Sequence, residues 1–203
     1  MRANRAVGGD IAAVARVDAD RFGTSTKTRP ADIGVMGTDS TAQFEESLRG
    51  LADGCHRTDG KGFADTLADV VVEPAVGASL PFDGVSLEGT PVVVDPSVDQ
   101  LREAATGVTP AGLGIANYGT VTVRSRAEGD ELLSLYPRRH VVVLDASDIV
   151  PDMTAAFEQL AAEFDAGRTS QVLTTGPSAT ADMGSLVQGV HGPESVHVIV
   201  LES

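Results

Sequence analysis

Val196-His197-Val198-Ile199-Val200-Leu201 is the stretch of this chain that decides its fold. Apart from His197, its side chains are apolar and mostly β-branched, and they lack the polar alternation of a strand that keeps one face in water. The run therefore predicts a central strand of a parallel or mixed sheet, buried on both faces. Residues 171–175 upstream predict a second strand, followed by a hydroxyl-rich loop at 176–182, a short helix, and a turn at 189–193.

Helices and short apolar runs alternate through the rest of the sequence. We expect helices after Ser40, at 63–71, after Pro96 with Asp95 as the cap, and from Pro151 to about Gly167. The expected strands are 75–79, 92–94, 113–116, 120–124, 132–136 and 140–144. Asn117-Tyr118-Gly119 has the turn chemistry of a hairpin. This alternation predicts an α/β fold: a single domain with a mixed, mostly parallel sheet flanked by helices.

The chain is strongly acidic. It carries 29 Asp and Glu residues against 15 Lys and Arg, which gives a formal net charge of −14. This balance argues against binding to nucleic acid or to anionic membranes, because both require a basic surface. The acids are spread along the sequence, which is typical of a halophile-like surface adapted to high salt, where screening weakens self-repulsion.

The single cysteine, Cys55, bounds the redox chemistry and the compartment. It excludes an internal disulfide and fits a reducing cytoplasm. It also excludes an iron–sulfur cluster held by this chain alone, because a cluster usually needs four thiolates, so we expect no cofactor on this chain. No apolar run approaches the roughly 20 residues of a membrane span, and the N-terminus lacks the hydrophobic core of a signal peptide.

Residues 1–35 differ from the sequence that follows. They contain several basic residues, few large apolar side chains, and a Gly-Thr-Ser-Thr-Lys-Thr run with no periodic face to bury. We expect most of this segment to be a disordered extension of an α/β domain at 36–203. Organised sequence begins directly after Met36, so Met36 is a candidate for the biological start.

Three blocks of sequence carry a family resemblance. The first is Ala111-Gly112-Leu113-Gly114-Ile115-Ala116-Asn117-Tyr118-Gly119-Thr120-Val121, and the second is Leu132-Leu133-Ser134-Leu135-Tyr136-Pro137 with His140-Val141-Val142-Val143. The third joins Thr175-Gly176-Pro177-Ser178-x-Thr180-Ala181-Asp182 to Gly189-Val190-His191-Gly192-Pro193 and His197-Val198-Ile199. In their joint order these blocks resemble the LUD-domain family, the lactate-utilisation protein C group.

This resemblance implies a fold similar to ribose-5-phosphate isomerase and the CoA transferases. It also implies a role in oxidising L-lactate to pyruvate alongside partner subunits that carry iron–sulfur clusters. In the similar CoA transferases a glutamate in the hairpin block attacks the thioester, and LUD-domain members commonly place an acid there, where this chain has Asn117. Because an amide cannot form the anhydride of covalent CoA transfer, we do not expect transfer by that route.

The loop at 176–182 is the first candidate ligand site. Gly176 would let a ligand approach the main chain, Ser178 and Thr180 offer hydroxyls, and Asp182 lies at the expected start of the short helix. The positive end of that helix and its free N–H groups would attract a small carboxylate or phosphate, which His191 could meet from the next turn. A capped loop without a ligand is an equally good interpretation of these residues.

Two further pairs of residues could contact a ligand. Arg138 and Arg139 are adjacent and could clamp a carboxylate or phosphate, but solvated charges beside a turn are the commoner arrangement. Asn117 and Thr120 could hydrogen-bond a ligand from the hairpin, but Asn and Gly in hairpin turns mostly serve backbone geometry. Both pairs are therefore weaker candidates than the loop.

Other kinds of site fit the sequence poorly. His191 and His197 lack the same-face spacing of a zinc pair and have no evident third ligand, so we expect no metal. Cys55 in an exposed-looking loop beside His56 could be a reactive thiol, but an incidental cysteine is the better interpretation. No Gly-x-Ser-x-Gly elbow of a serine hydrolase is present, and the glycines at 112–114 precede a strand instead of opening a helix, unlike a Rossmann site.

Two classes of function remain. The first is an accessory subunit of an iron–sulfur-dependent lactate oxidation system, without turnover of its own. The second is a stand-alone enzyme that binds a small anion on a sugar-phosphate isomerase or acyl-CoA scaffold. The resemblance favours the first, and so does the single cysteine, because it leaves the clusters to partner subunits. Fold by itself names neither ligand nor reaction.

Overall fold

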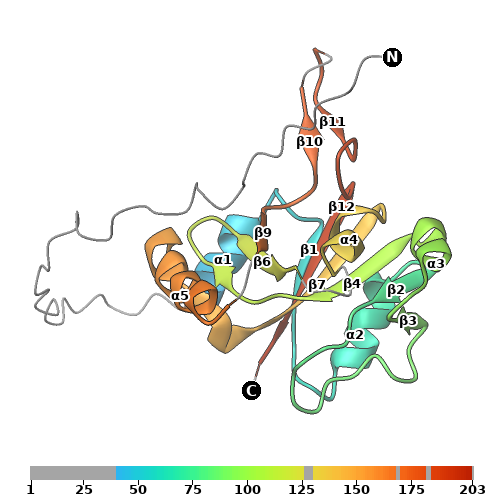
Figure 1. Ribbon diagram of the computed structural model, residues 1–203, viewed down its shortest axis with the longest axis horizontal. Coiled ribbons are helices and arrows are strands. Elements are labelled where there is room, and N and C mark those ends of the chain that lie inside the picture. Colours follow the sequence, from blue (N-terminus) through green and yellow to red (C-terminus); the bar gives the residue numbers. More distant parts are fainter. Residues whose placement is uncertain (1–39, 126–129, 168–169, 182–183, 203) are drawn as a thin grey trace, which may run out of the picture. The chain divides into compact units, whose positions relative to one another are not determined.

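A six-stranded parallel sheet forms the centre of the protein (Figure 1). The computed structural model describes residues 40–125, 130–167, 170–181 and 184–202, all of which belong to one compact unit. The strands run in the order β1-β12-β7-β4-β2-β3, with every neighbouring pair parallel. They are β1 (Gly54–Thr58), β2 (Ala75–Gly77), β3 (Val92–Val94), β4 (Thr106–Pro110), β7 (Arg139–Asp145) and β12 (Ser195–Leu201). The predicted α/β class with a mostly parallel sheet is confirmed.

The C-terminal strand β12 is an interior strand, paired with β1 on one side and β7 on the other. Its successive side chains alternate between the two faces of the sheet. Val196, Val198 and Val200 enter one hydrophobic cluster, whereas Ile199 and Leu201 enter another on the opposite face. The prediction that this run is buried on both faces is therefore confirmed.

The helix α2 (Phe63–Val70) covers one face of the six-stranded sheet. Phe63, Leu67 and Val70 recur at helical spacing and are at most 3% exposed. They share a cluster with Val141 and Ile199 from the central strands. The helix expected at 63–71 is thus confirmed, and it is amphipathic because only this face meets the sheet.

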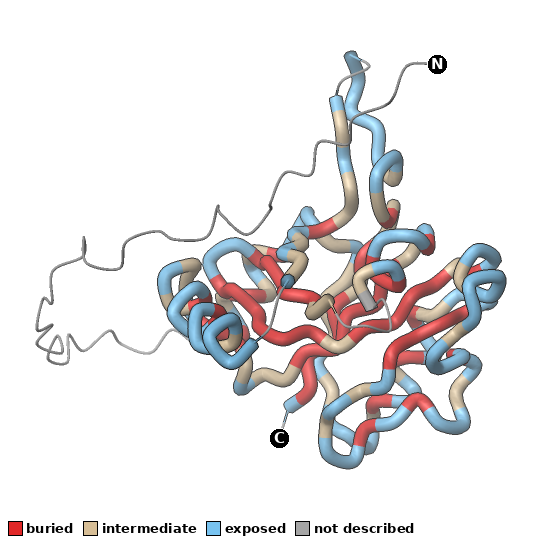
Figure 2. Tube along the Cα trace, viewed as in Figure 1, coloured by how far each residue is buried: buried red, intermediate tan, exposed pale blue. Residues whose placement is uncertain are grey.

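The opposite face is covered by α1 (Ser40–Leu48) and a second, four-stranded sheet. Helix α1 buries Phe44 and Leu48 in the cluster that contains the β12 valines. The small sheet has the order β8-β5-β6-β9, and its strands are β5 (Gly114–Ile115), β6 (Thr120–Arg124), β8 (Ile149–Val150) and β9 (Gln171–Thr174). Strands β5 and β6 pair antiparallel, which confirms the expected hairpin. Figure 2 shows buried backbone in both sheets, between largely exposed helices.

The helix α5 (Met153–Asp165) lies on the outer side of the small sheet. It starts at the side-chain cap of Asp152 and not at Pro151. Its buried residues, Ala156 and Leu160, pack against Ile115. Phe157 lies outside this buried face and is 55% exposed. The molecule therefore has four layers: α2, the main sheet, the small sheet with α1, and α5.

Two predicted elements are wrong in type. Residues 132–136, expected as a strand, mostly belong to α4 (Asp130–Leu135), because a short apolar run does not distinguish a strand from a buried helix. The helix expected after the loop at 176–182 is replaced by an antiparallel pair, β10 (Ala179–Thr180) and β11 (Val187–Gln188). Figures 1 and 2 show this hairpin standing out from the two sheets, with a largely exposed surface.

Two helix ends also differ from the prediction. The helix α3 (Val98–Glu103) begins at a capping box formed by Ser97 and Gln100, not at Asp95. Its Val98 is 64% exposed and belongs to no core. The spacing of Phe44, Leu48 and Leu51 predicted a helix that continues to Gly54, but α1 ends at Leu48, and Leu51 is 46% exposed.

The expectations for residues 1–35 and Met36 fall outside the described residues and stay predictions. None of the helices within the described ranges has the length and apolar character that a membrane crossing requires.

We predict that Val198→Asp destabilises the domain by at least about 3 kcal/mol, because it leaves an unpaired carboxylate in the core. Val198 is 1% exposed. The matched control is Val190→Asp, at a position that is 51% exposed, where the change should stay within about 0.5 kcal/mol. Urea unfolding followed by circular dichroism measures both free energies. Equal stability of the two variants would show that β12 is not buried on both faces.

Candidate functional site

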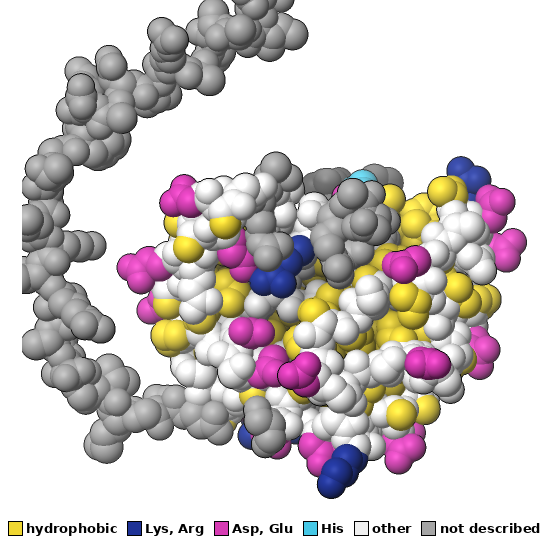
Figure 3. Space-filling model, turned by 60° about the horizontal axis from the view of Figure 1, so that its bottom comes forward, with side chains coloured by type: hydrophobic (Ala, Val, Ile, Leu, Met, Phe, Trp, Pro, Cys, Tyr) yellow, Lys and Arg dark blue, Asp and Glu magenta, His cyan; other side chains and the backbone are white. Residues whose placement is uncertain are grey.

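A cleft of about 590 Å³ lies at the carboxyl ends of the parallel strands. Ala111 follows β4, Asp145 ends β7 and Leu201 ends β12, and all three line the cleft. Gly60 follows β1, and the loop after β2 contributes the side that contains Phe82. Ligands of open α/β sheets bind at this edge, and the volume falls in the range of small-molecule sites, roughly 300–1,000 Å³. Figure 3 views the molecule toward this edge.

Arg124 is the cationic residue of the cleft lining. It ends β6, and its Nη2 donates to Oε1 of Glu163 at 2.9 Å. Oε2 of Glu163 in turn accepts from Nε2 of Gln171 at 2.6 Å. Glycine is required at 112, because a Cβ there would lie 2.9 Å from the Thr122 hydroxyl and 3.3 Å from Nε of Arg124. The guanidinium is therefore held by packing and by an ion pair before any ligand arrives.

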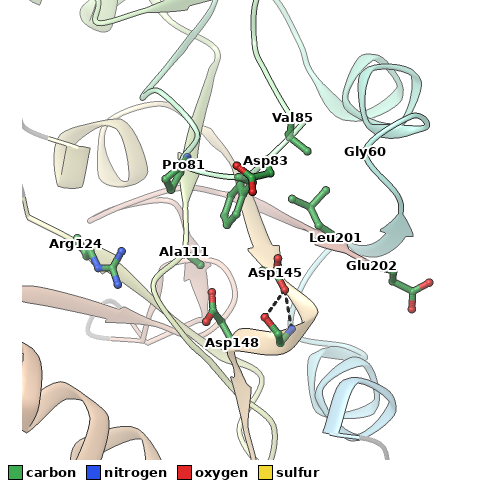
Figure 4. A pocket seen from close by; sticks show the side chains of 12 residues that line it. Gly60, Pro81, Asp83, Val85, Ala111, Arg124, Asp145, Asp148, Leu201 and Glu202 are labelled. Atoms are coloured by element: carbon green, nitrogen blue, oxygen red, sulfur yellow. Dashed lines mark hydrogen bonds between the residues drawn. The ribbon is translucent and has the colours of Figure 1, made fainter.

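Two carboxyl groups lie on the turn that follows β7. Asp145 caps the 3₁₀ helix η3 (Ala146–Asp148), and its Oδ1 accepts from the backbone N and the hydroxyl of Ser147, at 2.8 and 2.7 Å. Burial raises the pKa of Asp148, and the charges of Asp145 and Glu163 raise it further, while Arg124 acts against them. Figure 4 shows Arg124 and Asp148 on the same side of the cleft, with Ala111 between them. A cleft carboxyl with a raised pKa is suited to hydrogen bonding or proton transfer.

The far side of the cleft is more apolar. Val85 and Leu201 belong to one buried hydrophobic cluster, against which the partly buried Phe82 packs, and Leu201 is the register partner of Asp145. Glu202 also lines the cleft, but its carboxylate is engaged by Arg57, whose Nε donates to it at 2.6 Å. Asp83 is exposed at the rim. The cleft thus combines an apolar wall with a polar wall in which carboxylates exceed guanidinium groups.

The loop at 176–182 does not have the geometry that its anion-site interpretation required. Among the described residues between 176 and 188 no helix begins, so no helix dipole points at this loop. Gly176, with φ of 64°, packs against the backbone after α1, where a Cβ would lie 2.6 Å from the carbonyl oxygen of Leu51. Asp182 lies outside the described residues. The glycine is explained by this close approach of two backbones.

The other candidates from this region belong to the base of the β10–β11 hairpin. The backbone N of Ser178 donates to the carbonyl of Pro193, and its own carbonyl accepts from Gly189. Thr180 is part of β10, and His191 is exposed. These contacts account for the residues structurally, and ligand binding by them stays a prediction.

The structure brings Thr120 to this same region. Its hydroxyl lies 2.6 Å from the hydroxyl of Thr175, next to Gly176. Asn117 is exposed at the β5–β6 turn, and its backbone N donates to the carbonyl of Pro151. Neither Asn117 nor Thr120 lines the cleft at the strand ends.

Arg138 and Arg139 do not form a clamp. Arg138 donates through Nε to Oε2 of Glu194 at 3.0 Å and through Nη2 to Oε1 at 2.8 Å. Arg139 instead donates through Nη1 to the carbonyl of Val70 at 2.8 Å, at the end of α2. Consecutive residues at the start of a strand point in opposite directions, so the adjacency in sequence does not bring the two guanidinium groups together.

Cys55 lies in the edge strand β1 and not in an exposed loop. Burial, and then the charge of Glu45, raises the pKa of its thiol to about 12, so the thiolate is disfavoured. The neighbouring His56 points its Nε2 toward Nδ1 of His197 at 3.4 Å, a pair that the sequence did not reveal. The pKa of His197 is lowered, first by burial and then by Arg139.

His140 is fully buried beside the same end of the sheet. Its Nε2 lies 2.8 Å from the hydroxyl of Thr109, and burial lowers its pKa to about 3. Among the described residues, no three or more His, Cys, Asp or Glu side chains are grouped so that they could hold a metal ion.

Known proteins place this chain in a family. A family model described as the LUD domain matches residues 63–201, more than half of the chain. The chain belongs to the LUD-domain family. Two LUD-family relatives are named lactate utilization protein C: one from Bacillus licheniformis, 35% identical over 53% of this chain and 47% of that protein, and one from Deinococcus radiodurans, 36% identical over 50% and 49%. The chain thus spans about half the length of the curated relatives it matches.

A solved structure agrees with the LUD-domain assignment. The crystal structure of a DUF162 family protein from Deinococcus radiodurans is similar to this chain with a TM-score of 0.61 and 25% sequence identity. The similarity covers 81% of this chain and 97% of that protein. The family predicted from the three sequence blocks is confirmed, and so is the fold class.

The sequence analysis missed every residue of the cleft. The lining comes from six separate segments, of which only the carboxyl end of β7 carries a visible signal: Asp145-Ala146-Ser147-Asp148 directly after a buried apolar run. Polar residues at that position of a parallel strand face the ligand edge of the sheet. Arg124 could not have been found in this way, because it reaches the cleft from the other sheet.

We predict that the domain loses stability on mild acidification. The pKa of His140 falls from 6.5 to about 3 on folding, so the unfolded chain binds one proton more than the folded chain between these values. The stabilisation is complete above about pH 6.5 and is lost as the pH falls, by about 1.4 kcal/mol per pH unit. His197, whose pKa is also lowered, acts in the same direction.

Urea unfolding between about pH 6.5 and about pH 5, where most carboxyls stay ionised, measures this slope. The double variant His140→Leu with Thr109→Val removes both buried polar partners and should flatten the slope. An unchanged slope in the double variant would contradict the role of His140.

Proposed function

We propose that this protein takes part in the utilisation of L-lactate, as an accessory subunit of an iron–sulfur-dependent system that oxidises lactate to pyruvate. The observation that carries the proposal is the similarity to proteins named lactate utilization protein C, within a chain that belongs to the LUD-domain family. Because the matched region is about half of those relatives, the activity, substrate and partners of the whole assembly are part of the proposal.

Iron–sulfur clusters are assigned in this proposal to partner subunits and not to this chain. The chain has one cysteine, whereas a cluster usually takes four thiolates. That cysteine is moreover a poor ligand, since burial raises the pKa of its thiol to about 12 and metal binding requires the thiolate. A reducing cytoplasm is the compartment that we propose, in keeping with a thiol that has no partner for a disulfide.

A stand-alone enzyme is the second candidate, and one observation favours it. The cleft at the carboxyl edge of the main sheet contains Arg124 and a carboxyl, Asp148, with a raised pKa. Such a pair is a common feature of catalytic sites. Covalent CoA transfer is still not proposed, because Asn117 occupies the position where the similar transferases place their nucleophile.

The genetic prediction is that a strain without this gene no longer grows on L-lactate as the sole carbon source but grows normally on pyruvate. Pyruvate is the control because it is the product of the proposed oxidation and enters metabolism after the missing step. A plasmid copy of the gene should restore growth on lactate. Normal growth of the deletion strain on lactate would refute the accessory role.

The biochemical prediction is that the purified chain is colourless, contains no stoichiometric iron and does not oxidise lactate by itself. Absorption spectroscopy and metal analysis test the first two points, and a dye-reduction assay tests the third. Lactate oxidation should appear when the cluster-bearing subunits are added. Turnover of lactate by the isolated chain would instead support the stand-alone enzyme.

A further inference from the structure

We propose that the cleft at the carboxyl edge of the main sheet binds an uncharged polyhydroxyl compound, such as a sugar or a glycosyl group, and not a small carboxylate. The inference goes beyond the lactate proposal and does not depend on it, because it concerns the ligand of this chain alone. It rests on three properties of the cleft: its charge, its hydrogen-bonding groups and its two dissimilar walls.

The charge of the cleft disfavours anions. Its lining has a single cationic side chain, Arg124, and that charge is already opposed by Glu163 at 2.9 Å. Asp145 and Asp148 both line the cleft. Burial raises the pKa of Asp148, and the negative charge of Asp145 raises it further. A carboxylate or phosphate would enter a field that is negative here and negative over the whole chain, whose net charge is −14.

The hydrogen-bonding groups of the cleft suit hydroxyls. Carboxylates accept only and a guanidinium donates only, while the Ser147 hydroxyl donates to Asp145 and can still accept, so the lining offers acceptors and a donor side by side. A hydroxyl is the ligand group that can satisfy either kind. An ammonium group could serve the carboxylates, but it only donates, so it could not also accept from the guanidinium of Arg124 as a hydroxyl can.

Asp148 is the acceptor best placed for such a hydroxyl. Asp145 is committed to Ser147 through two hydrogen bonds to one oxygen, and Glu202 is committed to Arg57. Asp148 is partly buried on the wall that Figure 4 shows beside Arg124. Carboxylates recognise the paired hydroxyls of sugars in this way at the same edge of other parallel sheets.

The apolar part of the lining suits the apolar face of a sugar ring. Phe82 is partly buried, and Val85 and Leu201 are at most 8% exposed. A pyranose has C–H groups on one face and hydroxyls around its rim, so it can contact this wall while its hydroxyls reach Asp148. The cleft volume of about 590 Å³ accommodates a ligand of that size or larger.

The test compares three probes that share a pyranose ring and differ in charge: D-glucose, D-glucose 6-phosphate and D-glucosamine. Binding is measured by saturation-transfer NMR at constant ionic strength and pH, with L-lactate as a fourth probe. We expect D-glucose to bind at least about threefold more tightly than the phosphate, because the phosphoryl group brings negative charge to a lining in which carboxylates already outnumber the guanidinium. D-glucosamine tests whether the same carboxylates prefer a cation to a hydroxyl. L-lactate should give no saturable signal.

Two variants place the site. Asp148→Asn keeps the shape and removes the charge of the acceptor, so the affinity for D-glucose should fall about tenfold. Gly60→Phe should block the cleft, and it should fold, because a Cβ at this position meets nothing closer than 3.6 Å. The matched control is Asp99→Asn on α3. The side chain of Asp99 is 90% exposed and does not line the cleft.

Each other result overturns the proposal. Absence of a D-glucose signal in the parent protein removes its basis. A D-glucose signal that persists unchanged in both cleft variants puts the ligand elsewhere. Preferred binding of the phosphate or of lactate makes the cleft an anion site, and preferred binding of D-glucosamine makes it a cation site. None of these results alters the growth test on lactate, so failure of one proposal is distinguishable from failure of the other.

Discussion

Burial of β12 on both of its faces is the constraint on which the rest of this structure depends. A strand with valine, isoleucine and leucine on both sides must be covered twice, and backbone pairing on both edges must satisfy its N–H and C=O groups. Strands β1 and β7 provide the pairing, and α2 covers one face. The other face needs a second cover, which the chain supplies with α1 and the small sheet. The layered arrangement follows from that single requirement.

The same parallel arrangement separates two kinds of polar residue. Toward the amino ends of β7 and β12 lie His140 and His197, whose charged forms are disfavoured by burial, and His56 lies in the middle of β1 with its ring near that of His197. At the carboxyl ends lie Asp145 and Asp148, which face a cleft. Parallel strands gather all carboxyl ends at one edge, so the acids converge there although they are distant in sequence from Arg124 and Phe82. We therefore expect the histidines to make the stability of the fold depend on pH, whereas the acids line the cleft proposed as the ligand site.

The charge of that cleft bears on how this LUD-domain protein would serve lactate utilisation. A direct lactate site would be expected to present unopposed cations, and the cleft has one guanidinium already paired with Glu163. Membership of the family therefore does not require that this chain itself holds lactate. The proposed role beside cluster-bearing subunits agrees with the proposed uncharged ligand of the cleft, because substrate oxidation would then take place on another protein.

The sequence by itself determined most strands, most helices and the family, but strands β1 and β4 of the main sheet were not predicted. The apolar run at 196–201, the α2 positions Phe63, Leu67 and Val70, and the β5–β6 hairpin were all predictable, because periodicity and turn chemistry are local properties. It was wrong about α4 and about the segment between Gly176 and Val187, since short apolar or small-residue runs take their form from what they pack against. Only the tertiary structure decided the cleft, the separation of Arg138 from Arg139, and the pairing of His56 with His197. These depend on which strands become neighbours, and no local pattern contains that order.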